Sequence, residues 1–130
     1  MSGDEGDLLQ VWETTYKKGL LSFWILLVLH RQAAYARELG RLVEQASGGT
    51  LTADDNSLYR ALNRFERVGL IAGEPRPSKV GPDRRYYRLT GKGRRLLRRF
   101  AERNILVFQR DDVRRRVAAL FAARQPKQEN

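Results

Sequence analysis

The stretch GPDRRYYRLTGKGRR, residues 81–95, constrains the fold more strongly than any other part of the sequence. Tyrosines set among arginines favour a β-strand, whereas Thr90 followed by a glycine-punctuated, arginine-rich segment favours the start of a helix. A loop with three prolines separates this strand from a short apolar stretch upstream. We therefore predict a β-hairpin, with strands at about Leu70–Gly73 and Arg84–Leu89, that leads directly into a helix.

The rest of the chain shows helical periodicity. A first helix, from about Leu8 to Arg31, becomes apolar on nearly all sides, which is typical of a helix at the centre of a core. A second helix is predicted at about Ala34–Ala46, and a third from Asp54 or Asp55 to Val68, where Gly69 stops it. Residues 91–124 are predicted to be helical, either as one long helix or as two.

Positive charge is concentrated in one segment. The chain has 25 Lys and Arg against 15 Asp and Glu, a net charge of +10. Residues 76–103 carry eleven bases and only two acids, whereas residues 1–13 carry four acids and no base. A surplus this concentrated indicates a surface that binds a polyanion, although a charged segment can also be merely solvated.

Several classes of function are excluded or disfavoured by composition. The chain has no cysteine and a single histidine, so disulfides, thiolate ligands and the usual zinc sites are excluded. The apolar run Gly19–Leu29 is too short to cross a bilayer, which needs about 20 residues. No phosphate-binding loop or catalytic constellation is present. We therefore expect a cytoplasmic protein that is not an enzyme, with no cofactor, no metal and no membrane partner.

The order of helix, helix, turn, helix, two-stranded hairpin and helix is that of a winged helix-turn-helix. We expect a mainly α fold with a small two-stranded β-wing. In such domains the second helix of the motif enters the major groove of DNA, where Arg suits guanine and Asn suits adenine. Taken alone, a polar stripe on a surface helix would say little; its place before a basic hairpin favours base reading. The candidate base-reading residues are Asn56, Ser57, Arg60, Asn63 and Arg64.

The wing is predicted to contact the DNA backbone. Alternation along its second strand puts Arg84, Tyr86 and Arg88 on the face opposite Leu89, so these three point outward if Leu89 points to the core. Cations on such a face contact phosphates and supply most of the affinity that does not depend on sequence. Tyr59, beside the apolar stripe of the third helix, is either a further phosphate contact or a core tyrosine.

Three segments together resemble the PadR family of bacterial transcriptional regulators. SLYRALNRFERVGLI (Ser57–Ile71) is similar to the family's recognition helix, and GPDRRYYRLTGKGRRLL (Gly81–Leu97) is similar to its wing signature. KKGLLSFWILLVL (Lys17–Leu29) more loosely resembles its first helix. The resemblance covers roughly residues 16–100, with the wing signature as its most specific part.

The resemblance implies a homodimer that binds a palindromic operator in double-stranded DNA, usually as a repressor and sometimes relieved by a small aromatic ligand. It also implies that the C-terminal helix packs against the partner, often onto the partner's N-terminal helix. The candidate backbone-contacting residues are Tyr35, Tyr59, Arg76, Lys79, Arg84, Arg85 and Tyr86. The candidate dimer-interface residues are Leu97, Phe100, Val107, Phe108, Val113, Val117, Leu120 and Phe121.

Two tryptophans, Trp12 and Trp24, are candidates for lining an effector pocket, although aromatics at helical spacing more often belong to a core or a dimer interface. The predicted organisation is a disordered acidic leader at 1–7, a DNA-binding domain at 8–90, a helical dimerisation region at 91–124 and a polar tail at 125–130. A second function stays open at this point: a winged-helix module that docks a protein or RNA and has no preference for a duplex sequence.

Overall fold

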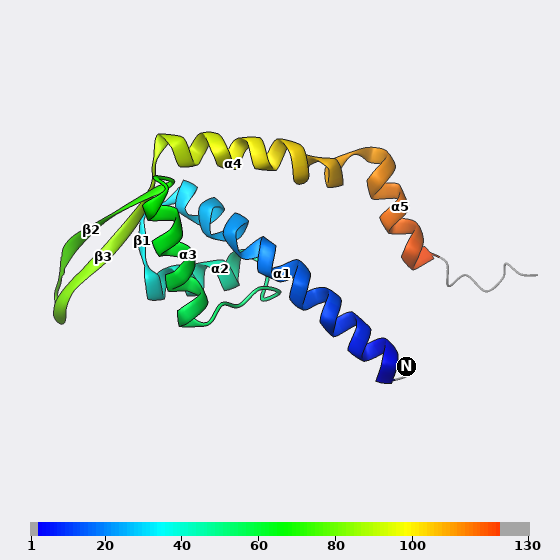
Figure 1. Ribbon diagram of the computed structural model, residues 1–130. Helices are drawn as coiled ribbons and strands as arrows, with labels where there is room; N and C mark the ends of the chain where they lie inside the picture. Colours follow the sequence, from blue (N-terminus) through cyan, green and yellow to red (C-terminus); the bar gives the residue numbers. More distant parts are fainter. Residues whose placement is uncertain (1–2, 123–130) are drawn as a thin grey trace, which may run out of the picture. The chain divides into compact units, whose positions relative to one another are not determined.

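The computed structural model describes residues 3–122, which form two compact units that divide between Leu97 and Arg98. The elements of the first unit are α1 (Gly3–Arg31), β1 (Ala34–Tyr35), α2 (Ala36–Ala46), α3 (Asp55–Arg67), β2 (Ile71–Ser78), β3 (Gly81–Leu89) and the start of α4 (Gly91–Asn104). This order, which can be followed in Figure 1, confirms the predicted winged helix-turn-helix fold.

The sheet has three strands, not the two expected. The strand order is β1-β3-β2, with both pairings antiparallel, and β1 contributes only Ala34 and Tyr35, opposite Tyr87 and Tyr86. A two-residue strand is too short to show the alternation by which strands are recognised in a sequence. The wing is also longer than predicted, and Pro77 lies at an irregularity of the edge strand β2, where a missing N–H costs no ladder hydrogen bond.

The first helix starts earlier than predicted. Residues 3–7, expected to belong to a disordered leader, are helical, so that prediction is wrong for them. Asp4 and Glu5 lie in the first turn, where carboxylates interact favourably with the positive end of the helix dipole. Residues 1–2 of the predicted leader and the predicted tail at 125–130 lie outside the described residues. None of the described helices combines the length and apolar character needed to cross a membrane.

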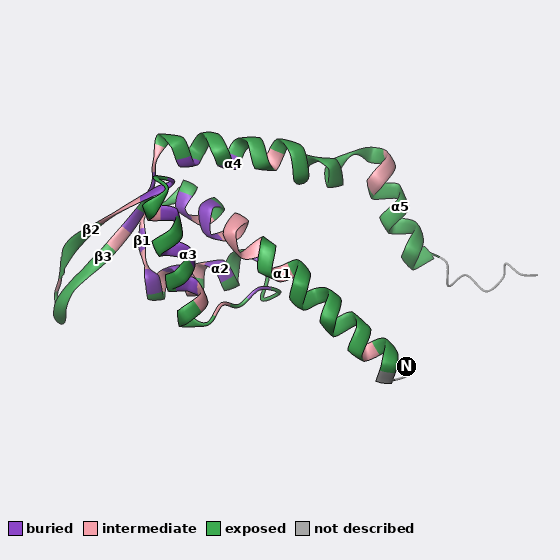
Figure 2. Ribbon diagram, in the orientation of Figure 1, coloured by how far each residue is buried: buried purple, intermediate pink, exposed green. Residues whose placement is uncertain are grey.

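The core of the first unit forms where α1, α2 and α3 meet the base of the wing (Figure 2). Only the C-terminal part of α1 is buried, because its N-terminal half extends beyond the other elements of this unit. The largest fully buried side chains come from all three helices and from β2. They are Ile25, Leu39, Val43, Leu58, Leu62 and Ile71.

A hydrogen-bonded joint connects the end of α3 to the start of α4. The N–H of Thr90 donates to the carbonyl of Leu70 at 3.0 Å, and the Thr90 hydroxyl lies 2.7 Å from the carbonyl of Gly69. The same hydroxyl oxygen accepts from the N–H of Gly93 at 3.0 Å and so caps α4. Lys92 donates from Nζ to the carbonyl of Val68 at 2.8 Å. We call these contacts the α3–α4 joint.

The second unit resolves the alternative left open for residues 91–124. α4 ends at Asn104, a 3₁₀ turn η1 (Leu106–Gln109) follows, and α5 (Asp111–Ala122) begins after Arg110. The guanidinium of Arg110 donates to the carboxylate of Asp112 at 3.1 and 2.7 Å, which holds the chain at the start of α5. The described part of this region is therefore two helices joined by a short turn.

The α3–α4 joint predicts that Gly93→Ala destabilises the protein. A Cβ at Gly93 would overlap the carbonyl oxygen of Leu70 and lie 2.8 Å from Cδ1 of Leu89. We expect the free energy of unfolding in urea to fall by about 1–3 kcal/mol, the usual cost of overpacking. Gly91→Ala is the matched control, because its nearest neighbour is the flexible Arg95 side chain at 3.4 Å. Equal stabilities for the two variants would contradict this account.

Candidate nucleic-acid interface

The N-terminus of α3 is capped by Asp54. Oδ1 of Asp54 accepts from the N–H of Ser57 at 2.7 Å, and the hydroxyl of Ser57 donates to Oδ2 at 3.2 Å. The hydrogen bond from this N–H is the main reason why the pKa of Asp54 is lowered. Arg60 donates to the hydroxyl of Ser57 at 3.3 Å, so a cation also lies over the cap.

The exposed face of α3 carries the predicted base-reading residues. Leu58, Leu62 and Phe65 are buried and fix the orientation of the helix on the core. The opposite stripe is exposed except at Ser57, which is half-buried in the capping network. The members of this stripe are Asn56, Ser57, Arg60, Asn63 and Arg64.

The outer face of the wing is a ladder of stacked cations and rings. Arg84 lies over the ring of Tyr35 at 4.4 Å, and Arg76 lies over the ring of Tyr86 at 4.6 Å. The two rings meet edge to face with their centroids 5.3 Å apart, because Tyr35 and Tyr86 are register partners. Stacking holds each guanidinium over a ring, where a cation can still meet a further acceptor. Nε of Arg76 also lies 4.0 Å from Oε2 of Glu74. Lys79 is exposed in the turn at the tip of the wing.

Arg85, the neighbour of Arg84, lies on the other face of β3. It donates from Nη2 to Oε2 of Glu66 in the last turns of α3, and this bond is the main reason why the pKa of Arg85 is raised. The N–H of Gly73 donates to the same carboxylate oxygen at 3.3 Å. The structure therefore separates two adjacent arginines that the sequence analysis treats alike.

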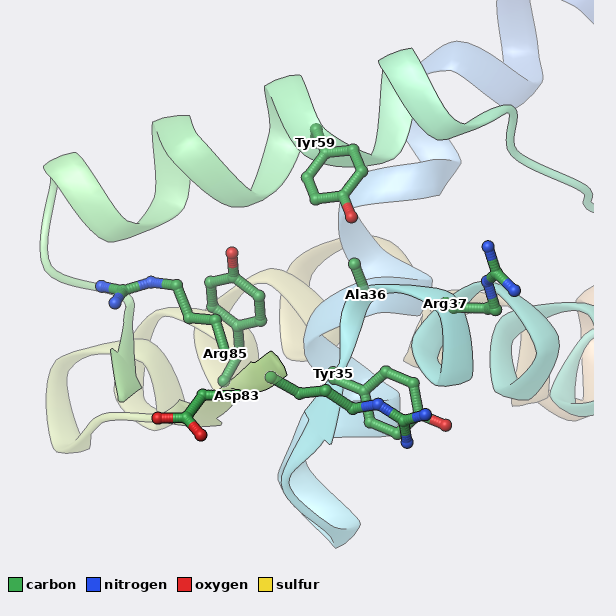
Figure 3. Close-up of a pocket in the computed structure, with 8 residues that line it drawn as sticks. Tyr35, Ala36, Arg37, Tyr59, Asp83 and Arg85 are labelled. Atoms are coloured by element: carbon green, nitrogen blue, oxygen red, sulfur yellow. The ribbon is translucent and has the colours of Figure 1, made fainter. Parts of the chain in front are cut away.

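A groove of about 320 Å³ lies between α3, the start of α2 and β3. Figure 3 shows Tyr59 directed into it from α3, with Tyr35 and Arg37 on the opposite side. Tyr59 is 48% exposed, so it is not the core tyrosine that was the alternative. The remaining lining residues are Ala36, Asp83, Arg84, Arg85 and Tyr87.

Sequence reasoning missed Arg37 as a lining residue of this groove. It directly follows the β1–α2 junction, and only the three-dimensional pairing of β1 with β3 brings that junction to the wing. Its cation and that of Arg84 give the groove two positive charges against the one negative charge of Asp83, with Arg85 already paired. Tyr87 is buried at the edge of the groove, and burial raises the pKa of its hydroxyl.

The two tryptophans proposed to line an effector pocket are not brought together. Trp12 is 73% exposed on α1, and the twelve residues to Trp24 correspond to about 18 Å of helix. Trp24 does line a wide hollow of about 560 Å³, formed by α1 and α2, with Leu27 and Leu42 on its apolar side and Arg31 among its polar residues.

The predicted dimer-interface residues differ in how far they are exposed. Leu97 is buried in the core of its own unit, where it is not accessible to a partner. Val113 is half-buried. The others are exposed large apolar side chains of α4, η1 and α5, and they are Phe100, Val107, Phe108, Val117, Leu120 and Phe121.

Comparison with known proteins identifies the family. Residues 25–99 match the model of the transcriptional regulator PadR-like family. A PadR-like transcription factor from Bacteroides fragilis is 34% identical, with a TM-score of 0.59 over 68% of this chain and 84% of that one. A PadR family transcriptional regulator from Eggerthella lenta is 27% identical, with a TM-score of 0.71 over 83% of this chain and 92% of that one.

A further solved structure shares the fold at lower identity. PadR from Bacillus subtilis, solved in complex with operator DNA, is 18% identical, with a TM-score of 0.57 over 62% of this chain and 46% of that one. No match to a curated protein was found. The family match, which spans more than half of the sequence, and the similarity to the Bacteroides fragilis factor establish that the chain belongs to the PadR-like family of transcriptional regulators.

Proposed function

We propose that the protein regulates transcription by binding double-stranded DNA at a specific sequence, with α3 in the major groove and the wing along the flanking backbone. The observation that carries this proposal is the position of the groove between Tyr59 and Arg84, directly beside the exposed polar stripe of α3. A backbone phosphate in the groove would meet Arg37 and Arg84 while base edges face Asn63. The Bacillus subtilis PadR, which has the same fold, was solved in complex with operator DNA, and this supports DNA binding as the function of such a domain.

We further propose that the protein acts as a repressor, as a homodimer on a palindromic operator. Leu8, Trp12 and Tyr16 on α1, and Leu120 and Phe121 on α5, are exposed apolar residues of the kind that a second copy covers. The two half-sites should then lie about one helical turn of DNA apart. This role requires binding alone and no chemical step. We propose that the protein works in the cytoplasm, where the operator is accessible.

Relief of repression by a small aromatic ligand is the remaining part of the proposal. The hollow beside Trp24 is the site that fits such a ligand, because an indole and aliphatic side chains line it together with a cation, Arg31. An aromatic carboxylate matches that combination of an apolar surface and a positive charge.

The test of the proposed function is fluorescence anisotropy with duplexes from the region upstream of the protein's own gene, compared with scrambled duplexes at two salt concentrations. We expect one upstream duplex to bind at least about 10³-fold more tightly than its scrambled version, and that preference to persist at the higher salt. Equal binding of both duplexes that disappears with salt would instead indicate a generic polyanion binder or a docking module.

Asn63→Ala should relax sequence discrimination. Asn63 is exposed in the middle of the stripe, and a lost bidentate contact to a base costs about 1–3 kcal/mol. We expect affinity for the operator to fall by that amount, while affinity for random duplex stays unchanged. Gln45→Ala is the control, because it removes an exposed amide from α2. Equal losses on operator and random DNA would rule out base reading by Asn63.

Leu120→Ser should weaken the dimer. Leu120 is 73% exposed in one chain, and burying a leucine contributes about 1.5–3 kcal/mol, twice over in a two-fold symmetric interface. Sedimentation equilibrium should show a dimer dissociation constant raised about tenfold or more. Ala119→Ser alters a position off the apolar stripe of α5 and should leave the constant unchanged. A monomeric parent protein would refute the dimer outright.

A further inference from the structure

Adjacent arginines on β3 have different electrostatic surroundings. The guanidinium of Arg84 lies over the ring of Tyr35 and lines the groove beside α3. The guanidinium of Arg85 is paired with Glu66, whose side chain is 30% exposed, against 48% for Arg85. A carboxylate shielded to this degree from water competes with any phosphate for the same cation. Within residues 3–122 no acid pairs with Arg84, so it can bind a phosphate without giving up an ion pair there, whereas a phosphate at Arg85 would compete with Glu66.

Glu66 receives donors from both strands of the wing. One of its oxygens, Oε2, accepts from the side chain of Arg85 on β3 and from the N–H of Gly73 on β2, the latter at 3.3 Å. Glu66 itself belongs to the last turns of α3. A single carboxylate therefore connects the proposed recognition helix to both arms of the hairpin.

Gly73 is required for this arrangement by a steric constraint. A Cβ at Gly73 would lie 2.7 Å from Nε and 3.0 Å from Cζ of Arg85, so the guanidinium lies against the bare backbone of β2. Gly73 is also the register partner of Tyr87, whose ring centroid lies 5.9 Å from the Arg85 guanidinium carbon. Any side chain at position 73 would displace the guanidinium from its place beside Glu66. In Figure 3 the Arg85 side chain turns away from Arg37.

We infer that Arg85 is a positioning residue: together with Glu66 and Gly73 it forms a brace that sets the wing relative to α3, and it does not bind the DNA backbone. This inference rests on the proposed DNA-binding function and replaces the backbone contact that the sequence analysis expects of Arg85. Of these two adjacent arginines, Arg84 is then the one that presents its cation to phosphate.

Salt dependence of binding separates the two roles. Each phosphate neutralised by a protein cation contributes about 0.9 to the slope of log affinity against log salt. We expect Arg84→Ala to reduce the slope on random duplex by about that amount. Arg85→Ala should leave the slope within about 0.3 of the parent, yet weaken operator binding several-fold because the wing loses its position. Arg41→Ala, which removes an exposed cation from α2, controls for the loss of charge alone.

Two further variants distinguish the brace from an effect of net charge on DNA binding. Glu66→Ala removes an acid, which should strengthen binding to DNA if charge alone mattered. The brace instead predicts weaker operator binding, with the double variant Glu66→Ala, Arg85→Ala no worse than either single one. Gly73→Ala changes no charge and should lower operator affinity to a similar extent. The inference would be overturned if Arg85→Ala reduced the salt slope as much as Arg84→Ala does. It would also be overturned if Glu66→Ala bound the operator as tightly as the parent protein.

Hydrogen exchange tests the brace without DNA. The Gly73 amide should exchange roughly five to ten times faster in Glu66→Ala and Arg85→Ala, because a hydrogen bond and the contact that orders it are lost. Unchanged exchange in both variants would overturn the brace even if DNA binding were normal. If the parent bound no DNA while the Gly73 amide still exchanged faster in both variants, the proposed function would fail and the brace would stand. Far-ultraviolet circular dichroism confirms that each variant is folded.

Discussion

The carbonyl group of Leu70 is the point on which the arrangement of the DNA-binding unit depends. It accepts the N–H of Thr90 and lies 3.0 Å from the Thr90 hydroxyl, and the missing side chain of Gly93 lets α4 approach it closely. Leu70 leads into β2 and Thr90 leaves β3, so this one acceptor closes the base of the wing. The residues after α3, the base of the wing and the first turn of α4 are therefore held together at this one place.

A hairpin held only at its base would still bend along its length. The Glu66 carboxylate provides a second attachment further along the wing, and β1 provides a third by pairing with Tyr86 and Tyr87. Fixing the wing at three places lowers the conformational entropy that would be lost when it docks on DNA. Stacking of Arg76 on Tyr86 and of Arg84 on Tyr35 restricts these two cationic side chains in the same way.

The helices and the wing could be predicted from local sequence, and the contacts between elements could not. The apolar stripe of α3, Gly69 at its end and the alternation of β3 are local patterns, and each was confirmed. β1 is too short to have a pattern, and the helical state of residues 3–7 depends on the continuation of α1. The partner of Arg85 lies nineteen positions away in another element, a distance that no periodicity reveals.

Net charge is therefore a poor measure of how many phosphates a domain like this can bind. Cations that are contiguous in sequence diverge in space: Arg84 is stacked and accessible, Arg85 is paired with Glu66, and Lys92 caps the C-terminus of α3 through Val68. Arg85 and Lys92 count toward the net charge of +10, but their bonds are made within the protein itself. What matters for recognition is which cations are already held by an internal acceptor, and for the adjacent pair Arg84 and Arg85 the carboxylate of Glu66 on α3 decides that.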